Sequence, residues 1–160
     1  MKKGFTLIEI LVVISIIGIL TTLIMANLNT ARERARDAQR KSDLKSIQTA
    51  LGLYYNDYEM YPANDSDGRI NGCEGETGAG PCDWDGEWSR GETVYMNTLP
   101  ADPVSTNKYV YSQTDSDHYT LTACLENKSD PKCDKIDGDI VGCSVSGSEI
   151  DDGCQYTVKP

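Results

Sequence analysis

The feature that most constrains this chain is a long apolar run close to its N-terminus. Phe5 to Ala26 holds 22 residues, rich in Ile, Leu and Val, behind a short basic lead at residues 1–4. As a helix the run is about 33 Å long, which is enough to cross the hydrocarbon core of a bilayer. A secretory signal peptide has a shorter apolar region of roughly 7–15 residues. We therefore expect residues 5–28 to form a transmembrane segment or the core of an assembly.

A carboxylate inside this run, Glu9, is its most unusual residue. An ionisable group near the centre of a spanning helix costs roughly 2.5–3.5 kcal/mol, and less near its edge. Glu9 lies near the edge, so the cost is tolerable, but a plain membrane anchor gives the residue no function. An ordinary signal peptide and a plain anchor stay open as alternatives.

An amphipathic pattern continues the helix beyond the apolar run. No proline occurs between Ala26 and Pro62, and apolar residues recur at steps of three and four, as on one helical face. They are Leu28, Ala31, Ala35, Ala38, Leu44, Ile47, Leu51, Tyr54 and Tyr58. We predict one helix from about residue 5 to about residue 58, roughly 80 Å long. Its second half, residues 29–61, is expected to pack on a sheet of the same chain.

Charge is distributed unevenly along the chain. Residues 1–45 carry 8 basic and 4 acidic groups, a net charge of +4, whereas residues 46–160 carry 7 basic and 21 acidic groups, a net charge of −14. Such an acidic part repels phosphate backbones, so it is not expected to bind nucleic acid. With a single histidine, His118, catalysis by histidine has little to draw on, and we expect no enzyme. The basic residues 32–45 are expected to be a solvated, salt-bridged surface or to contact lipid headgroups or neighbouring acidic heads.

Six cysteines lie in the acidic part, which predicts disulfides and an oxidising compartment. They are Cys73, Cys82, Cys124, Cys133, Cys143 and Cys154. Zinc is disfavoured because its sites use close pairs such as C-x2-C, while the closest spacings here have eight, eight and nine intervening residues. Six cysteines allow about 15 connectivities. The simplest joins nearest neighbours: 73–82, 124–133 and 143–154.

The remaining sequence, residues 62–160, predicts a small α+β head. Lys108–Gln113 and His118–Cys124 alternate with period two around a polar turn, which indicates a hairpin. Ile140–Ser146 and Gln155–Lys159 are weaker strand candidates. Within the polar stretch 63–93, Trp84 and Trp88 are expected to cover a small core, although a carbohydrate-binding platform is the alternative.

Acidic residues raise the possibility of calcium, which prefers six to eight oxygen ligands. Three groups occur: Asp65, Asp67, Asn71 and Glu74; Asp130, Asp134, Asp137 and Asp139; and Glu149, Asp151 and Asp152. None has EF-hand spacing, so the metal ligands are unknown and solvated loops are the simpler expectation. No phosphate-binding loop, serine nucleophile elbow or Cys–His constellation is present.

The sequence Lys3-Gly4-Phe5-Thr6-Leu7-Ile8-Glu9, followed by the apolar run, resembles the class III leader of type IV pilins and type II secretion pseudopilins. The resemblance implies that a prepilin peptidase cleaves between Gly4 and Phe5 and N-methylates Phe5. Glu9 matches the glutamate of this family that functions in assembly, and Gly18 matches a glycine. Ala26 stands where many relatives carry a proline, which leaves Gly18 as the weak point of the helix.

A second stretch, Leu99–Pro103 with the sequence L-P-A-D-P, resembles the major pseudopilin of type II secretion systems. Tyr109 and Tyr111 follow it as in that family, but Val104 replaces the usual aromatic residue. The resemblance also implies the ladle shape of a pilin. Its parts are a leader at 1–4, an apolar half at 5–28, an amphipathic half at 29–61 and a disulfide-containing head at 62–160.

The resemblance implies a structural subunit of a helical filament, leaning to the major pseudopilin of a protein secretion machine. Its partners are a prepilin peptidase, copies of itself and other pilins or pseudopilins, an inner-membrane assembly platform and membrane lipid. It implies a location in the inner or cytoplasmic membrane, single-pass with the head outside the cytoplasm, and a filament in the periplasm or at the cell surface. A calcium site in a loop of the sheet region is also implied. A subunit of a surface pilus for adhesion, motility or DNA uptake, or a monomeric membrane-anchored binding protein, remains an alternative.

Overall fold

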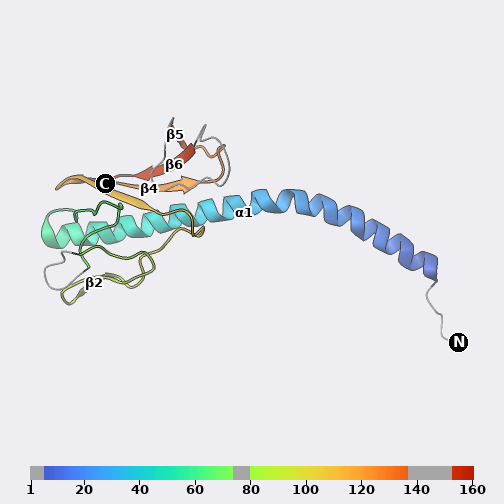
Figure 1. Ribbon diagram of the computed structural model, residues 1–160, viewed down its shortest axis with the longest axis horizontal. Helices are drawn as coiled ribbons and strands as arrows, with labels where there is room; N and C mark the ends of the chain where they lie inside the picture. Colours follow the sequence, from blue (N-terminus) through green and yellow to red (C-terminus); the bar gives the residue numbers. More distant parts are fainter. Residues whose placement is uncertain (1–5, 74–79, 137–152) are drawn as a thin grey trace.

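The computed structural model describes residues 6–73, 80–136 and 153–160, without the side chains of residues 23, 24, 26 and 27. A single long helix, α1 (Leu7–Tyr58), runs through most of the molecule, and a compact head surrounds its C-terminal part (Figure 1). The described strands are β1 (Trp88–Arg90), β2 (Thr93–Met96), β3 (Val110–Asp115), β4 (His118–Leu125), β5 (Asp134–Ile136) and β6 (Gly153–Val158). The α+β fold expected from the sequence is confirmed.

Helix α1 has well-defined caps at both ends and no break between them. Thr6 is the N-cap residue, with φ −86° and ψ 151°, and Glu59 ends the helix in the left-handed conformation with φ 54°. The backbone N–H of Glu59 donates to the carbonyl of Tyr55 at 2.8 Å. The helix passes through Gly18 without interruption and curves gently along its length (Figure 1).

The buried stripe of α1 begins with charged residues. Its members recur at steps of three and four, as on one helical face: Asp37, Arg40, Leu44, Ile47, Leu51 and Tyr54. The expectation that Ala31, Ala35 and Ala38 continue this face is wrong, because all three are exposed. The alanines are out of phase with Leu44, and the stripe instead extends back through Arg40 and Asp37.

A four-stranded antiparallel sheet in the order β3-β4-β6-β5 packs against one side of α1 (Figure 1). The predicted hairpin is present, with Tyr111 opposite Leu121. Tyr119, Leu121 and Ala123 share the buried face of β4 as expected. The C-terminal candidate strand is β6, whereas residues 140–146 lie outside the described residues.

The ribbon β1–β2 lies on the other side of α1 and was not predicted (Figure 1). Its residues Trp88 and Tyr95 are buried against Tyr54, with ring centroids 5.8 and 5.3 Å from that ring. Trp84 is half-buried and contacts Tyr109 edge-to-face at 5.8 Å. Trp88 therefore belongs to the core and Trp84 packs against it, as expected for residues that cover a small core rather than form an exposed carbohydrate platform.

The outer edge of β3 is covered by the segment between α1 and the ribbon. The backbone N–H of Tyr111 donates to the carbonyl of Gly68 at 2.8 Å, and that of Gln113 donates to Asn64 Oδ1 at 2.9 Å. Gly68 has φ +74°, and a Cβ there would lie 2.7 Å from Val110 Cγ1. Only glycine allows this close approach, so the covering segment depends on it.

Candidate assembly surface

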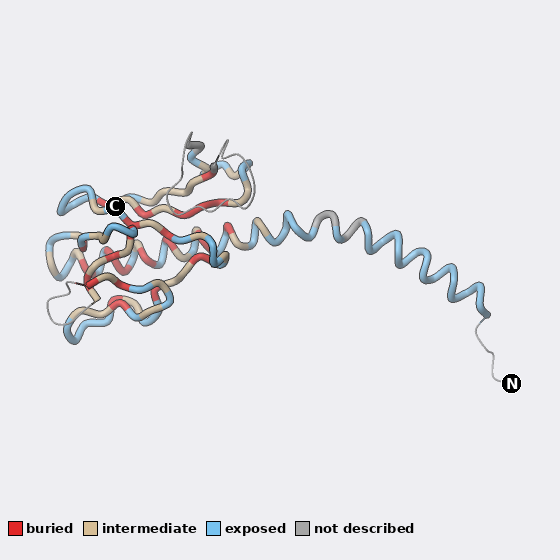
Figure 2. The backbone as a smooth tube through the Cα atoms, viewed as in Figure 1, coloured by how far each residue is buried: buried red, intermediate tan, exposed pale blue. Residues whose placement is uncertain are grey.

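The apolar half, whose described part is residues 7–28 of α1, projects away from the head, and its described side chains are exposed (Figure 2). Its large apolar side chains between Leu7 and Leu20 are 49–82% exposed. A monomeric soluble protein rarely exposes so large a continuous apolar surface. In a single chain, these described side chains therefore lack the apolar surroundings that so large an apolar surface normally has.

Each polar side chain of the apolar half between Thr6 and Thr22 is hydrogen-bonded within the helix itself. Ser15 Oγ donates to the carbonyl of Leu11 at 2.8 Å, and Thr21 Oγ1 donates to that of Ile17 at 2.7 Å. Thr22 Oγ1 donates to the carbonyl of Ile19 at 2.8 Å. Because burial of an unpaired hydroxyl group is costly, these bonds lower the free-energy cost of placing this surface in an apolar environment.

Glu9 is held by a capping box at the start of α1. Its carboxylate Oε2 accepts hydrogen bonds from the Thr6 backbone N–H at 2.9 Å and from Thr6 Oγ1 at 2.7 Å. In return, the Glu9 N–H donates to Thr6 Oγ1 at 3.3 Å. This reciprocal arrangement satisfies donors that the first turn leaves unpaired. Gly4 and Phe5, where cleavage and methylation are expected, lie outside the described residues.

Within the described ranges, no helix combines the length and the apolar character needed to cross a membrane. This finding differs from the transmembrane segment expected for residues 5–28.

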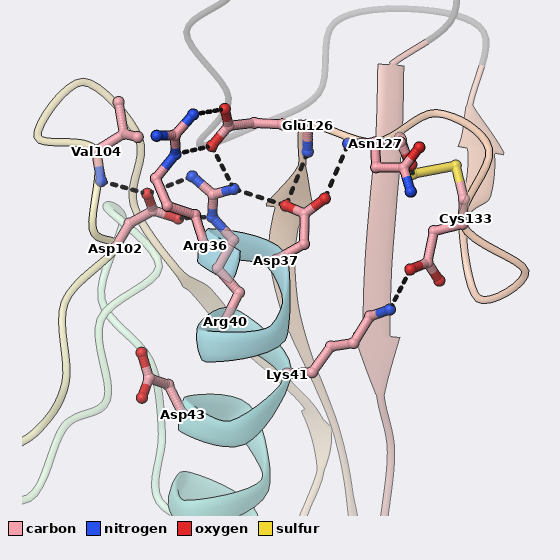
Figure 3. Close-up of polar contacts among 12 residues, drawn as sticks. Arg36, Asp37, Arg40, Lys41, Asp43, Asp102, Val104, Glu126, Asn127 and Cys133 are labelled. Atoms are coloured by element: carbon pink, nitrogen blue, oxygen red, sulfur yellow. Dashed lines mark hydrogen bonds and ion pairs between the residues drawn. A yellow bond between two sulfur atoms is a disulfide. The ribbon is translucent and has the colours of Figure 1, made fainter. Parts of the chain in front are cut away.

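A cluster of charges, three of them buried and two partly exposed, joins α1 to the head (Figure 3). We call it the junction cluster: Arg36, Asp37, Arg40, Asp102 and Glu126. Arg40 is completely buried, and its Nε and Nη2 donate to the two carboxylate oxygens of Asp102 at 2.8 and 2.9 Å. Asp102 also accepts the backbone N–H of Val104 at 2.8 Å. The aspartate of the L-P-A-D-P stretch is thus the counterion of a buried arginine.

The other members of the junction cluster attach the loop that follows β4. Arg40 Nη1 donates to Asp37 Oδ1 and Glu126 Oε1, both at 2.8 Å. The Asp37 carboxylate accepts the backbone N–H groups of Glu126 at 2.9 Å and Asn127 at 2.8 Å. Arg36 forms a two-bond pair with Glu126. One helical turn therefore holds two separate loops of the head.

These contacts shift the pKa values of the cluster. Burial on its own lowers the pKa of the Arg40 guanidinium, but its bonds to Asp102, Glu126 and Asp37 outweigh burial and raise it overall. Bonds from Arg36 and then Arg40 hold the pKa of Glu126 below its usual value, against the effect of burial. Both groups are thus kept charged, which is what a buried pair requires.

Neighbouring basic residues fall into two groups. Lys41 pairs with Asp130 in the loop after β4 (Figure 3), and this contact lowers the pKa of the Asp130 carboxyl. Arg32 and Arg34 are exposed, and none of the described residues forms a hydrogen bond or ion pair with them. The expected salt-bridged surface is therefore found from Arg36 onward.

The described cysteines are disulfide-bonded. Cys73 pairs with Cys82 as expected, whereas Cys133 pairs with Cys154, so the expected pairs 124–133 and 143–154 are wrong. The reason is the sheet order: β5 lies beside β6, so the chain around Cys133 meets Cys154 across 21 residues of sequence. Cys124 is also disulfide-bonded, and Cys143 lies outside the described residues.

Within the described ranges, no three acidic, cysteine or histidine side chains come together as metal ligands. Asp65 accepts hydrogen bonds from Arg69, and Asp130 pairs with Lys41. Residues 74, 137, 139, 149, 151 and 152 of the candidate calcium groups lie outside the described residues. His118 is an exposed strand residue as expected, and its Nδ1 lies 2.8 Å from Asp115 Oδ1.

Sequence reasoning missed the junction cluster, although two signals for it were present. Asp37 and Arg40 precede Leu44 by seven and four residues, which places them in phase with the buried stripe. Asp102 lies between two prolines, in a stretch singled out only for its resemblance to a family.

Two family models match this chain, and together they cover the exposed helix and most of the head. The prokaryotic N-terminal methylation motif matches residues 1–25, and the family described as type II secretion system (T2SS), protein G matches residues 27–141. The chain belongs to the type II secretion protein G family. A core protein G from Pseudomonas aeruginosa is 32% identical over 110 residues, which cover 69% of this chain and 72% of that protein.

Other members of the protein G family match over shorter segments. Core protein G of Pectobacterium carotovorum is 41% identical over 64 residues, covering 40% of this chain and 41% of the relative. Its counterpart in Escherichia coli K12 is 43% identical over 61 residues, covering 38% and 42%. For these relatives the match spans about four-tenths of their length. No solved structure matches the chain.

Proposed function

We propose that this chain is a structural subunit of a helical filament, the major pseudopilin of a type II secretion system. Membership of the protein G family supports this role, and the exposed apolar half carries the argument. Leaving its large side chains in water costs roughly 1.5–3 kcal/mol each, relative to burying them against lipid or a neighbouring helix. The proposed role is structural and involves no catalysis by this chain.

The shape of the molecule favours an open filament rather than a closed oligomer. The apolar half extends from one end of the head along a single direction (Figure 1). When such helices pack in parallel with an axial offset, one surface of a copy meets a different surface of the next copy head-to-tail, and repetition of that contact builds a helical filament. The polar side chains that are already satisfied within α1 make this burial inexpensive.

We further propose that a prepilin peptidase cleaves between Gly4 and Phe5 and N-methylates Phe5 before assembly. The match to the N-terminal methylation motif supports this step. Intact mass spectrometry of the protein extracted from membranes is expected to show loss of residues 1–4 and gain of one methyl group. A mature chain beginning after Ala26 or Ala31 would overturn the proposal.

Before assembly, the apolar half is proposed to contact lipid of the cytoplasmic membrane while the head lies outside the cytoplasm. The disulfides support an oxidising location for the head. An inner-membrane platform is then proposed to transfer the subunit from lipid into the filament, where other apolar halves replace the lipid.

Cleavage gives Glu9 a second role in this proposal. The new α-amino group of Phe5 is positively charged near neutral pH, since such groups titrate near about 7.7–8.0. In the filament this amine and the Glu9 carboxylate both leave water, where an unpaired charge is costly. The amine of an incoming subunit can pair with Glu9 of one already in place and so set the axial register.

The capping box allows the charge of Glu9 to be tested separately from its capping. Glu9→Gln keeps a capping-box residue but removes the charge. Thr6→Val removes the N-cap hydroxyl but keeps the charge, and Glu9→Val removes the charge together with the carboxylate half of the capping box. If the charge pair directs assembly, Glu9→Gln and Glu9→Val lose filaments while Thr6→Val keeps most of them. Filament yield is measured by electron microscopy, with membrane-fraction immunoblots to confirm insertion. Normal filaments from Glu9→Gln or Glu9→Val would show that packing alone sets the register.

A further inference from the structure

The head carries opposite exposed charges at its two ends. At the end nearest the apolar half, the exposed cations are Arg32 and Arg34 of α1 and Lys128 and Lys132 of the loop after β4. We call these four residues the basic collar. The loop is fixed beside α1 by the junction cluster and by the pair of Lys41 with Asp130.

The acidic groups near the collar are mostly committed to other partners. Asp37, Asp102, Glu126 and Asp130 accept the bonds that hold the head to α1. Glu33 is half-buried, and Asp134 is exposed. Lys132 lies over the ring of Tyr156 at 5.8 Å, as does Lys41. Among the described residues of this end, the exposed charge is therefore mainly positive.

The opposite end of the head exposes carboxylates, which we call the acidic tip: Asp57, Glu59, Asp115 and Asp117. The β3–β4 turn lies beside the end of α1 (Figure 1), where Tyr55 Oη donates to Asp117 Oδ1 at 2.7 Å. The Tyr61 N–H also donates to the carbonyl of Ser116 at 2.8 Å.

Among the described residues, the cations at the acidic tip pair with only one of its four carboxylates, that of Asp115. The Arg90 guanidinium lies over the ring of Tyr58 at 4.0 Å and donates to Tyr54 Oη. His118 is hydrogen-bonded to Asp115.

We propose that the basic collar of one subunit binds the acidic tip of the next subunit along the filament axis. This inference rests on the proposed filament role and names the surfaces that its heads present to one another. Both ends belong to every copy, so the contact repeats head-to-tail, as an open filament requires.

The length of α1 fixes the offset between the two copies. Arg34 and Glu59 are separated by 25 residues of continuous helix, which corresponds to about 38 Å along its axis. A parallel copy displaced by that distance therefore brings its collar level with the acidic tip of the first. The apolar halves of the two copies then follow one another, so the contact joins axially stacked heads rather than side-by-side neighbours.

A cysteine pair tests this geometry directly in sheared filaments of the full-length chain. In the Arg34→Cys/Glu59→Cys variant, the two new cysteines of one subunit are too far apart to bond, because a disulfide needs Cα atoms within about 7 Å. The proposal predicts a ladder of disulfide-linked oligomers under mild oxidation, and no ladder from either single variant. A variant that forms filaments without a ladder overturns the proposal.

Charge reversal gives a second test that does not require new cysteines. Arg34→Glu is expected to reduce filament yield about fivefold, because repulsion replaces an exposed ion pair, and added Glu59→Lys is expected to restore part of it. Lys45→Glu serves as the control. It makes the same charge change at an exposed position of α1 that lies between the collar and the tip. Equal losses in the two variants would overturn the proposal.

Three further outcomes separate the possible causes. Loss of membrane retention by Arg34→Glu with normal filament yield would show that the collar contacts lipid headgroups, and would overturn the proposal. Absence of filaments from the unmodified chain would overturn the proposed function itself. Filaments from the unmodified chain, with no effect of either charge change, would overturn only the stacking of collar on tip.

Discussion

The two halves of α1 belong to one continuous helix but satisfy their side chains in opposite ways. In the apolar half, the apolar groups face outward and the polar groups bond inside the helix. In the amphipathic half, Leu44, Ile47 and Leu51 are buried, and the charges of Arg40 and Asp37 are buried with partners from distant loops. The amphipathic half thus finds its packing partners within one chain, whereas the large apolar side chains of the apolar half stay exposed. The comparison predicts that mutations will affect folding in one half and assembly in the other.

The largest expected effect comes from Arg40→Ala. Removal of one partner from a buried ion pair leaves uncompensated carboxylates and typically costs about 3–5 kcal/mol. We expect the head to lose about that much unfolding free energy while the apolar half stays helical. Urea unfolding followed by tryptophan fluorescence, on the detergent-solubilised full chain, measures the loss.

Arg34→Ala is the matched control for Arg40→Ala, because Arg34 lies on the same helix but is exposed and unpaired among the described residues. Its effect on head stability is expected to be within about 0.5 kcal/mol. Similar destabilisation by both variants would show that burial of the arginine charge with its partners is not what stabilises the head.

A smaller effect is expected from removing the Cys133–Cys154 disulfide, which joins the loop after β4 to β6. The chain-entropy relation gives about 3 kcal/mol for a loop of this size. The double variant Cys133→Ser/Cys154→Ser is expected to lower the unfolding free energy of the head. The helical circular dichroism signal of the apolar half is expected to stay unchanged. Unchanged stability would show that the junction cluster alone holds this loop.

The smallest effect is expected from acid. The pKa values of Glu126 and Asp130 are lowered in the folded head by Arg36 and Lys41. A lowered pKa contributes stability that is present above the unfolded value, about 4.3 for Glu and 3.9 for Asp, and is lost as pH falls through the folded value. Head stability should therefore decrease below about pH 4. The decrease should be smaller in Glu126→Gln, as measured by thermal unfolding between pH 7 and pH 3.

The sequence predicted the long helix because hydrophobic periodicity and the absence of proline are local signals. The predicted buried face was wrong for residues 31–40. A hydrophobic pattern counts alanine as apolar even where it is exposed, and counts arginine as polar even where, as at Arg40, it is buried. The identity of the partners of Arg40 depends on Asp102 and Glu126, which lie 62 and 86 residues away. Only the fold brings these groups together, so sequence reasoning had no means of pairing them.

The strands, too, were predicted only where the sequence carries a local signal. The β3–β4 hairpin was found because its residues alternate regularly, whereas β1 and β5 have three residues each, too few to show a period. The disulfide connectivity also depended on strand order: once β5 is placed beside β6, Cys133 and Cys154 are neighbours. In the assembly surface, Glu9 stood out as a carboxylate among apolar residues. Its capping partner Thr6 could also have been recognised, since T-L-I-E has the spacing of a capping box.

The cover over the edge of β3 has a consequence for the proposed filament, in which identical heads are crowded together. An open strand edge is a template for pairing with another chain, and crowded identical heads would meet such edges continually. Here the Tyr111 and Gln113 N–H groups are already occupied by Gly68 and Asn64. Strand addition along β3 would first require this segment to detach, so the edge is protected against runaway sheet growth. A bulky residue in place of Gly68 is expected to displace the covering segment and to leave this strand edge open to pairing with another chain.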